Sequence, residues 1–364
     1  MNRRQILIGG GTAAVGISGA AWLGVRGMGS MTEYQASVAE TRAALGARPG
    51  LTELVRFATL APNGHNTQPW RFRVRPDRIE ILPDVSRRTP VVDPDDHHLF
   101  VSLGCATENL VLAAAASGKV AEATFMEQGG GRLSIRFVTG NAVVDPIAAA
   151  IPHRQSTRGD YDGAPLSTAD LRALEAAATV QGVDTIVRTE RRDINRVRDL
   201  VLAGNSVQMA DQRFLHELKQ WLRFNPRDAL RTGDGLFSAA SGSPVVPTWA
   251  GPLLFDTFVT ARAENDRYAK QLRSSSGVAV FVGANANPEN WIRVGQACQR
   301  FSLQATALGL KCAFINQPVE VAALRSDLSA LVGANSRRPD ILMRFGRGSA
   351  LPFSARRPTS AVIS

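Results

Sequence analysis

The sequence predicts an α+β protein in which two related halves are fused into one chain. The first observation is a repeat: residues 101–118 and 292–309 carry glycine, alanine and leucine at matching positions, 191 residues apart, as in Gly104 and Gly295. The second is that both stretches have the composition of apolar helices rich in small residues. The third is that segments with the two-residue periodicity of strands surround each of them. Such a pattern indicates helices packed around antiparallel-rich sheets.

The first half begins with helical patterning over residues 31–60. Residues 71–75 and 78–82 then alternate between apolar and polar side chains, which predicts two strands joined by a tight turn. After the first repeat helix, residues 124–126 and 133–138 form a second candidate hairpin across a triple glycine. No helix follows that triple glycine, so it indicates a turn and not a phosphate loop.

The second half contains a helix with Leu171 and Leu174 on one face, and apolar strands at 278–282 and 341–345. Both repeat helices end at a glycine, where a left-handed cap needs no Cβ. The segment from about residue 219 to 270 is rich in aromatic residues, glycine and proline. It is interpreted as a substrate-binding loop or a lid, and the alternative is a loosely packed surface insertion.

Residues 1–30 are interpreted as a targeting segment and linker. Arg3 and Arg4 precede an apolar run that ends near Trp22, which is typical of a twin-arginine export signal. The expected location is therefore the periplasm or cell envelope. An uncleaved run could also serve as a membrane anchor. Gly9–Gly11 imitates a dinucleotide loop, but the second strand with its acidic end is missing.

Composition excludes several classes of protein. The net charge is +10, and 38 of the 42 basic residues are arginine because lysine occurs only four times. These arginines are spread along the chain without a basic helix stripe, so nucleic-acid binding is not expected. The charge suits an anionic cofactor or an anionic surface.

Three cysteines without a Cys-x-x-Cys spacing argue against disulfides or zinc. Adjacent His97 and His98 would face different ways, so no metal site is predicted.

The first motif with chemical content is Arg154-Gln155-Ser156-Thr157-Arg158. Two guanidinium forks and a hydroxyl within one turn can hold a phosphate dianion. The alternative is a surface loop with two solvated arginines.

The second motif runs from Ala61 to Phe72 and reads APNGHNTQPWRF. Gly64 lets backbone amides approach a planar ligand closely. Asn66 can donate and accept hydrogen bonds at once, which suits the pyrimidine edge of a flavin. The alternative is a structural Asx turn.

Together the two motifs resemble the signature segments of the FMN-dependent nitroreductase family, over most of residues 40–360. The resemblance implies a nitroreductase-like fold in which Arg154 and Ser156 hold the FMN phosphate and Gln155 lies beside the flavin ring. Arg158 belongs to the same binding segment. In the family the second motif comes from the partner subunit and covers the ring. The residues it implies here are Pro62, Asn63, Gly64 and Asn66.

Two further positions follow from the same resemblance. Asn316 and Gln317 align with the stretch that crosses the flavin near its reactive N5, where the family often has Glu-Gly. The chain departs from the family pattern there. Arg356, or its neighbour Arg357, resembles the C-terminal basic pair that reaches the phosphate. No catalytic acid or base is implied, so the catalytic residues stay unknown.

The two motifs occur once each and in the reverse of the family order. Residues 31–150 would therefore form one half and residues 151–364 the other, as a pseudo-dimer with one FMN per monomeric chain. The implied activity is two-electron reduction of a small acceptor, a nitroaromatic or a quinone, through bound FMN. NAD(P)H is the family's donor but is scarce outside the cytoplasm. The alternatives are an FMN-binding storage or sensing protein and a flavin-free structural descendant.

Overall fold

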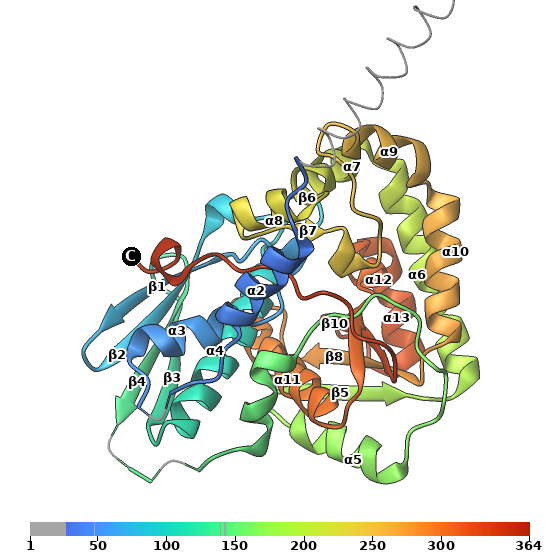
Figure 1. Ribbon diagram of the computed structural model, residues 1–364. Helices are drawn as coiled ribbons and strands as arrows, with labels where there is room; N and C mark the ends of the chain where they lie inside the picture. Colours follow the sequence, from blue (N-terminus) through green and yellow to red (C-terminus); the bar gives the residue numbers. More distant parts are fainter. Residues whose placement is uncertain (1–26, 47, 139, 142) are drawn as a thin grey trace, which may run out of the picture.

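The computed structural model describes residues 27–46, 48–138, 140–141 and 143–364 (Figure 1). The expected export signal and most of its linker lie outside these residues. Within them, the strands and helices expected from the sequence pattern are present, with ends that differ by a few residues. The glycines that follow the two repeat helices, Gly118 and Gly309, have φ of +76° and +73°, as a left-handed cap requires.

Two antiparallel four-stranded sheets carry the fold. The first has the order β1-β2-β4-β3, with β1 Trp70–Arg75, β2 Arg78–Pro83, β3 Val120–Met126 and β4 Arg132–Val138. The second has the order β5-β8-β10-β9, with β5 Val183–Arg188, β8 Gly277–Gly283, β9 Lys311–Phe314 and β10 Ile341–Gly346. In both sheets the fourth strand along the chain pairs with the second, and the third strand lies at the edge. The two sheets therefore share one topology.

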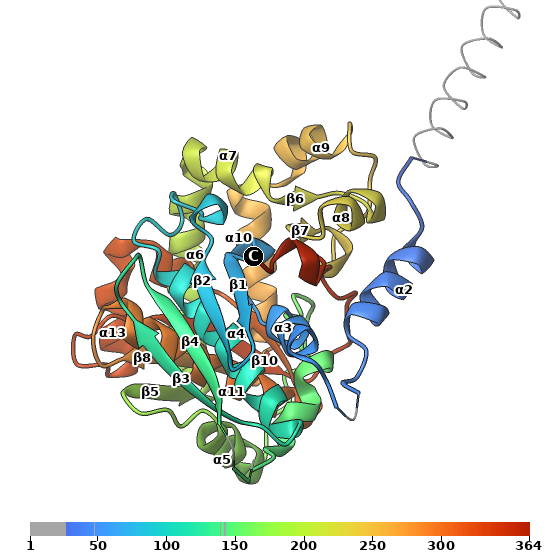
Figure 2. The same ribbon diagram turned by 90° about the vertical axis from the view of Figure 1, so that its left-hand side faces the viewer.

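A long helix follows the second strand of each sheet, and the two long helices pack against each other in the centre of the molecule (Figures 1 and 2). They are α4 His97–Ala116 and α11 Pro288–Ala307. A Cβ on Gly104 would lie within 3.0 Å of the Ile292 carbonyl oxygen, and a Cβ on Gly295 equally close to that of Val101. The 191-residue offset of the repeat exchanges these two contacts. The helices thus meet in a reciprocal way, as related copies do across a two-fold axis.

Polar pairs across the two helices repeat this reciprocity. The amide of Gln299 donates to Asn109 at 2.6 Å, and the guanidinium of Arg300 donates to Glu108 at 2.9 Å. Adding 191 to position 109 gives 300, and subtracting 191 from 299 gives 108, so the repeat offset converts one pair into the other. Arg300 also reaches Asp145 at 2.6 Å. These buried pairs fix the register in which the two helices cross.

Helix α4 is long and apolar enough to cross a membrane, by length and composition. Most of it is buried among the first sheet, α3 and α11, so it is a core helix here. Its apolar composition is explained by contact with protein on nearly every side.

The remaining elements cover the sheets and one end of the molecule. The helices are α2 Met31–Thr41, α3 Leu51–Thr59, α5 Thr168–Ala177, α6 Arg191–Ala210, α7 Gln212–Gln220, α8 Pro226–Thr232, α9 Gly251–Phe258, α10 Ala261–Arg273, α12 Gln317–Glu320 and α13 Arg325–Val332. The short strands β6 Leu222–Arg223 and β7 Leu236–Phe237 pair in parallel. One apolar core joins the first sheet, α4, α11 and one face of the second sheet. Another lies between the opposite face of the second sheet and α6, α10 and α13.

The inserted segment is larger than the sequence indicated. A tight turn joins β1 to β2, whereas the equivalent strands β5 and β8 are separated by everything from α6 to α10. The expected insertion of 219–270 covers only the later part of this segment. Ile194, Val201 and Leu272 are fully buried in the second core. These parts of α6 and α10 belong to the second core and lie outside 219–270, so the choice between a lid and a loosely packed surface insertion for 219–270 stays a prediction.

The C-terminal tail crosses back to the first half. The backbone N–H of Phe72 donates to Val362 at 2.7 Å, and that of Ser364 donates to Phe72 at 2.8 Å. The tail thereby extends the edge of the first sheet beside β1, where both views place the C-terminus (Figure 2). The last residues of the segment predicted as the second half therefore pack on the first half. This crossing brings Arg356 next to the loop that precedes β1.

Candidate functional site

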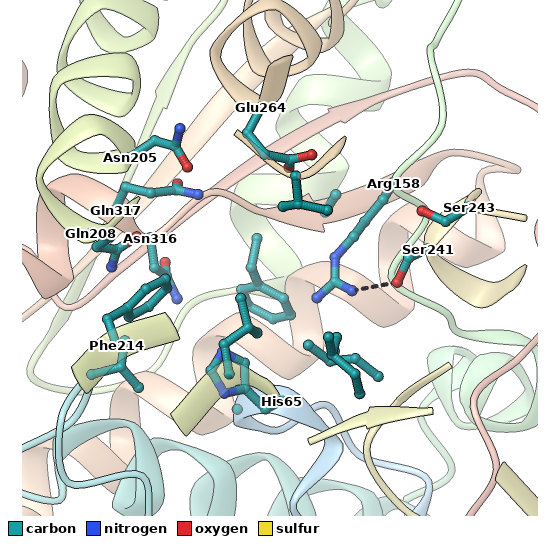
Figure 3. A pocket seen from close by; sticks show the side chains of 18 of the residues that line it. His65, Arg158, Asn205, Gln208, Phe214, Ser241, Ser243, Glu264, Asn316 and Gln317 are labelled. Atoms are coloured by element: carbon teal, nitrogen blue, oxygen red, sulfur yellow. Dashed lines mark hydrogen bonds between the residues drawn. The ribbon is translucent and has the colours of Figure 1, made fainter. Parts of the chain in front are cut away.

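A cavity of about 660 Å³ lies where the first half, the second half and the insertion meet. Six of the eleven residues predicted as cofactor ligands line it: Pro62, Asn63, Gly64, Arg158, Asn316 and Gln317. Figure 3 shows Arg158 extending into this space from one wall, with Asn316 and Gln317 on the other side. The insertion contributes a mainly apolar wall, which includes Phe214, Phe224, Leu236, Leu254, Phe255 and Phe258.

The loop before β1 is held in an unusual backbone conformation. His65, Asn66 and Gln68 have φ of 47°, 54° and 54°, in the left-handed region that non-glycine residues rarely adopt. The backbone N–H of Gln68 donates to the side chain of Asn63 at 2.7 Å, and its own side chain donates to Gly233 at 2.8 Å. Such strain costs on the order of 1–3 kcal/mol per residue and persists only where surrounding contacts fix it. The loop is therefore preorganised at the edge of the cavity.

The predicted role of Asn66 at a flavin edge is not supported by the structure. Its amide donates to the carbonyls of Gly235 and Ala355, at 3.0 and 3.2 Å. Its side-chain oxygen accepts from Arg356 at 2.8 Å. The side chain is buried, and both its oxygen and its nitrogen are engaged by protein. Asn66 joins the loop to the insertion and to the C-terminal tail.

Arg158 presents a guanidinium to the cavity. Its Nη1 donates to the Ser241 hydroxyl at 3.1 Å. Among the described residues, no carboxylate lies within ion-pair distance of it. Burial lowers the pKa of its guanidinium. Arg344 fixes the backbone around it by donating to Gly159 at 2.7 Å and stacking on Tyr161 at 4.1 Å. Arg158 is thus a positioned cation with unused donor capacity.

Arg154 and Arg356 lie beside the cavity and not in its wall, together with a third arginine, Arg42. Arg154 and Arg356 both donate to the carbonyl of Leu60, at 3.0 and 3.3 Å. Arg42 donates to the carbonyls of Pro152 and Arg154, at 2.8 and 3.2 Å. We call these three residues the arginine cluster. In the part of the chain that the structure describes, none of them has a carboxylate partner.

The electrostatics of the arginine cluster favour an anion. Burial and the neighbouring guanidiniums lower the pKa of Arg42 well below its usual value and the pKa of Arg356 to about 9. The buried Nε atoms of Arg42 and Arg154 have no hydrogen-bond partner. Like charges gathered without an acid are costly unless an anion neutralises them. A phosphate dianion, with three acceptor oxygens, matches this donor set.

No sequence motif indicates a role for Arg42. It caps the C-terminus of α2, outside both motifs and 112 positions before Arg154. Only the packing of α2 against the 152–154 segment brings it into the cluster, where its guanidinium also stacks on Phe353 at 4.0 Å.

Gln155 and Ser156 do not line the cavity. The amide of Gln155 donates to the carbonyl of Leu351 at 2.8 Å and accepts from the backbone N–H of the same residue at 3.1 Å. Ser156 forms a backbone bridge with Cys312 on β9. These contacts lend no support to the expected position of Gln155 beside a flavin ring, which stays a prediction. Its side chain anchors the C-terminal tail.

Asn316 and Gln317 open the short helix α12, and both line the cavity; their expected position near a flavin N5 stays a prediction. The side-chain oxygen of Asn316 accepts from the Leu342 N–H at 2.9 Å, which leaves its NH2 group free of that contact. The side-chain oxygen of Gln317 is buried without a hydrogen-bond partner. This wall offers amide groups to a polar ligand, where a Glu-Gly pair would offer a carboxylate.

The cavity wall also holds a titratable pair, His98 and Glu320, that no sequence motif indicates. His98 Nε2 lies 3.6 Å from Glu320 Oε1, and Gln208 donates to the other Glu320 oxygen at 2.6 Å. Burial raises the pKa of Glu320 and lowers the pKa of His98 to about 3. Neighbouring His97 points into the core, where it meets Asp340 at 3.0 Å. Among the described residues, no group of three or more His, Cys, Asp or Glu side chains could hold a metal ion.

Acid is expected to destabilise the fold through His98. Its pKa is about 3 in the folded protein, against about 6.5 when unfolded, so only the unfolded state binds a proton between these values. Its contribution to stability is therefore complete above pH 6.5 and is lost as the pH falls towards 3. In urea titrations of apoprotein from pH 6 to 4, His98→Gln should reduce the slope of unfolding free energy against pH by about 1.4 kcal/mol per unit. An unchanged slope would contradict this assignment.

No protein-family model matches the chain. It is 28% identical over 327 residues to Rv3131 of Mycobacterium tuberculosis, whose name assigns it as an NAD(P)H nitroreductase, with 85% of this chain and 90% of that protein covered. It is 25% identical over 322 residues to the acg protein of the same species, which is also named an NAD(P)H nitroreductase. That match covers 85% of this chain and 93% of the relative.

Solved structures with lower similarity include an FMN-bound nitroreductase from Desulfitobacterium hafniense, with 15% identity, a TM-score of 0.39, and 61% of this chain and 98% of that chain covered. The FMN-dependent nitroreductase NfnB from Mycobacterium smegmatis, in complex with NADPH, has 14% identity and a TM-score of 0.36. That match covers 55% of this chain and 86% of that chain.

Proposed function

We propose that the protein is an FMN-dependent oxidoreductase of the nitroreductase type. The observation that carries this proposal is the arginine cluster, in which three cations without a carboxylate partner among the described residues lie next to a large, mainly apolar cavity. The names of the relatives that match 85% of the chain agree with it.

The residues present suit FMN at both ends. The arginine cluster would hold the phosphate, because it supplies several guanidinium donors and has unpartnered buried Nε atoms. The cavity would hold the ring against the loop of Asn63 and Gly64, with Arg158 presenting a cation to it. The two regions are adjacent in the chain: Leu60 binds the cluster, and Pro62 already lines the cavity. When bound, the flavin would supply two-electron transfer to a small acceptor such as a nitroaromatic or a quinone.

The protein would bind and orient the reactants and limit the access of water. The apolar side chains of the insertion favour a planar, weakly polar acceptor in the remaining volume. Arg158 would stabilise negative charge on a group bound beside it, since its own charge has no carboxylate partner in the part of the chain that the structure describes. The His98–Glu320 pair would hold a proton at the cavity wall. His98 Nε2 and Glu320 Oε1 are 3.6 Å apart.

We further propose a single flavin site in a monomeric, pseudo-dimeric chain exported by the twin-arginine route. The first half supplies the loop of Asn63 and Gly64, whereas the second half supplies Arg158, Asn316 and Gln317. The shared sheet topology and the reciprocal contact of α4 with α11 support a fused pair of related halves. In such a chain the second subunit of a homodimer is not needed to complete the site.

The test is an absorbance spectrum of purified protein before and after anaerobic addition of NADPH. We expect a flavin band corresponding to one FMN per chain that bleaches on reduction. A band that persists would favour the alternative of flavin storage or sensing, or another electron donor. Protein that stays colourless after incubation with FMN would reject the proposed function.

A further inference from the structure

Helix α9 and the turn before it expose an unusual concentration of large apolar side chains. Trp249, Leu253, Leu254 and Phe258 are 71%, 65%, 38% and 67% exposed. The other large hydrophobic residues that are exposed in the described part of the chain are scattered over five separate places. We call these four residues the α9 patch. Patches of this kind on soluble proteins usually mark an interaction site.

The α9 patch belongs to an ordered element and not to a loose loop. Phe255 of the same helix is buried, and the ammonium of Lys219 lies over its ring at 5.6 Å. Leu254, Phe255 and Phe258 also line the cavity. Helix α9 therefore separates the cavity from the outside with apolar side chains on both of its faces.

The described chain begins at the same end of the molecule. The backbone N–H of Arg227 on α8 donates to the carbonyl of Met28 at 2.8 Å, and its guanidinium reaches Gly27. Helices α8 and α9 both lie at this end in two perpendicular views (Figures 1 and 2). The 26 residues before this point contain the twin arginines and an apolar run. That run is long enough in sequence to reach across a bilayer as a helix.

We propose that the α9 patch is a membrane-docking surface, which rests in the interface of a lipid bilayer. Tryptophan favours the headgroup level, and leucine and phenylalanine favour the acyl boundary below it. Asp256, the acidic residue of α9, is paired with Lys219, which reduces its repulsion from anionic lipid. One short apolar helix binds a bilayer weakly, but a tether at the same end makes its docking effectively intramolecular.

The docked orientation has a consequence for the cavity. Because Leu254 and Phe258 belong both to the α9 patch and to the cavity lining, the bilayer would face the apolar wall of the cavity. A lipid-soluble compound would meet α9 before it met water. The docking surface itself is independent of whether the cavity holds flavin.

The test uses full-length protein with a single added cysteine, Leu253→Cys, labelled with the environment-sensitive dye NBD. The native Cys105, Cys298 and Cys312 are buried and free, so labelling favours the new position. Thr124→Cys, on an exposed position of β3 in the first sheet, is the matched control. Both proteins are reconstituted into vesicles of phosphatidylcholine and phosphatidylglycerol, with and without doxyl-labelled lipid.

We expect doxyl lipid to quench the Leu253→Cys probe at least about twofold and to leave the Thr124→Cys probe unchanged, because a docked dye lies within the bilayer. Adding Phe258→Glu should abolish this quenching while the protein stays folded, since Phe258 is largely exposed. Quenching of the Leu253→Cys probe by aqueous iodide but not by lipid would overturn the proposal. The proposal would also be overturned if the dye emission shifted to the blue without quenching by doxyl lipid and the chain cross-linked to a second copy.

Discussion

Replacing Arg154 with methionine is expected to raise the dissociation constant for FMN by about 100-fold and to leave that for riboflavin nearly unchanged. Arg154 would donate two charge-assisted hydrogen bonds to the phosphate, each worth about 1.5–3 kcal/mol. A loss of about 3 kcal/mol corresponds to roughly a hundredfold change in affinity. Riboflavin has no phosphate, so it reports only the contacts of the ring in the cavity.

The apoprotein should tolerate this substitution. Methionine keeps the apolar stem of the side chain, and the carbonyl of Leu60 keeps Arg356 as its donor. Removing one buried cation also relieves the repulsion that lowers the pKa of Arg42 and Arg356. We therefore expect the free energy of unfolding of the apoprotein to change by less than about 1 kcal/mol, because no buried group is left unpaired.

A matched control is Arg191→Met. Arg191 also donates its guanidinium to backbone carbonyls, those of Leu272, Arg273 and Ser275, but it lies on α6 outside the arginine cluster and the cavity lining. This variant should lose stability and keep its affinity for FMN. Fluorescence titrations with FMN and riboflavin measure both ligands on all three proteins. If Arg154→Met weakened FMN and riboflavin alike, the arginine cluster would not be the phosphate site.

The largest loss of stability is expected for Gly104→Ala in the centre of the fold. Helix propensity alone favours alanine over glycine by about 1 kcal/mol. The new Cβ, however, would lie within 3.0 Å of the Ile292 carbonyl oxygen, and this backbone atom cannot move without separating α4 from α11. Overpacking of this kind costs about 1–3 kcal/mol and more where backbone is involved. We expect the free energy of unfolding to fall by about 3 kcal/mol, as read from urea denaturation.

Two further variants make this prediction specific. Gly295→Ala should cost about as much, because its Cβ meets the Val101 carbonyl in the reciprocal contact. The double variant should cost less than the sum, since one separation of the helices relieves both clashes. Gly46→Ala has no atom within 4 Å of its new Cβ and should change stability by less than about 0.5 kcal/mol. Equal, small effects at all three glycines would show that the helices are not in close contact.

Much of the fold could be predicted from local pattern because each element has its own period. Residues 71–75 and 78–82 alternate between apolar and polar side chains, and glycines follow both repeat helices. The structure has strands and helix caps at the positions that these local signals indicate. The size of the insertion could not be predicted in this way. Helix α6 belongs to it only because β8, not the segment after β5, is the strand that pairs with β5.

The candidate site was predicted in part. The resemblance of the two motifs to nitroreductase segments implied that Asn63, Gly64 and Arg158 lie together, and all three line one cavity. Asn66 and Gln155 were expected to face a ring, but backbone carbonyls from the insertion and the tail engage their amides. Which neighbour satisfies a buried amide depends on segments more than 150 positions away along the chain. No local pattern carries that information.

The sequence by itself determined the α+β class, the repeat and the two motifs, because periodicity and residue order are properties of the chain, whereas a shared site for the motifs followed only from the family resemblance. Only the tertiary structure decided that Arg42 joins Arg154 and Arg356, that His98 and Glu320 share a cavity wall, and that α9 turns an apolar face outward. These features depend on which surfaces pack together. Packing depends on the shape and burial of the whole chain and not on any one segment.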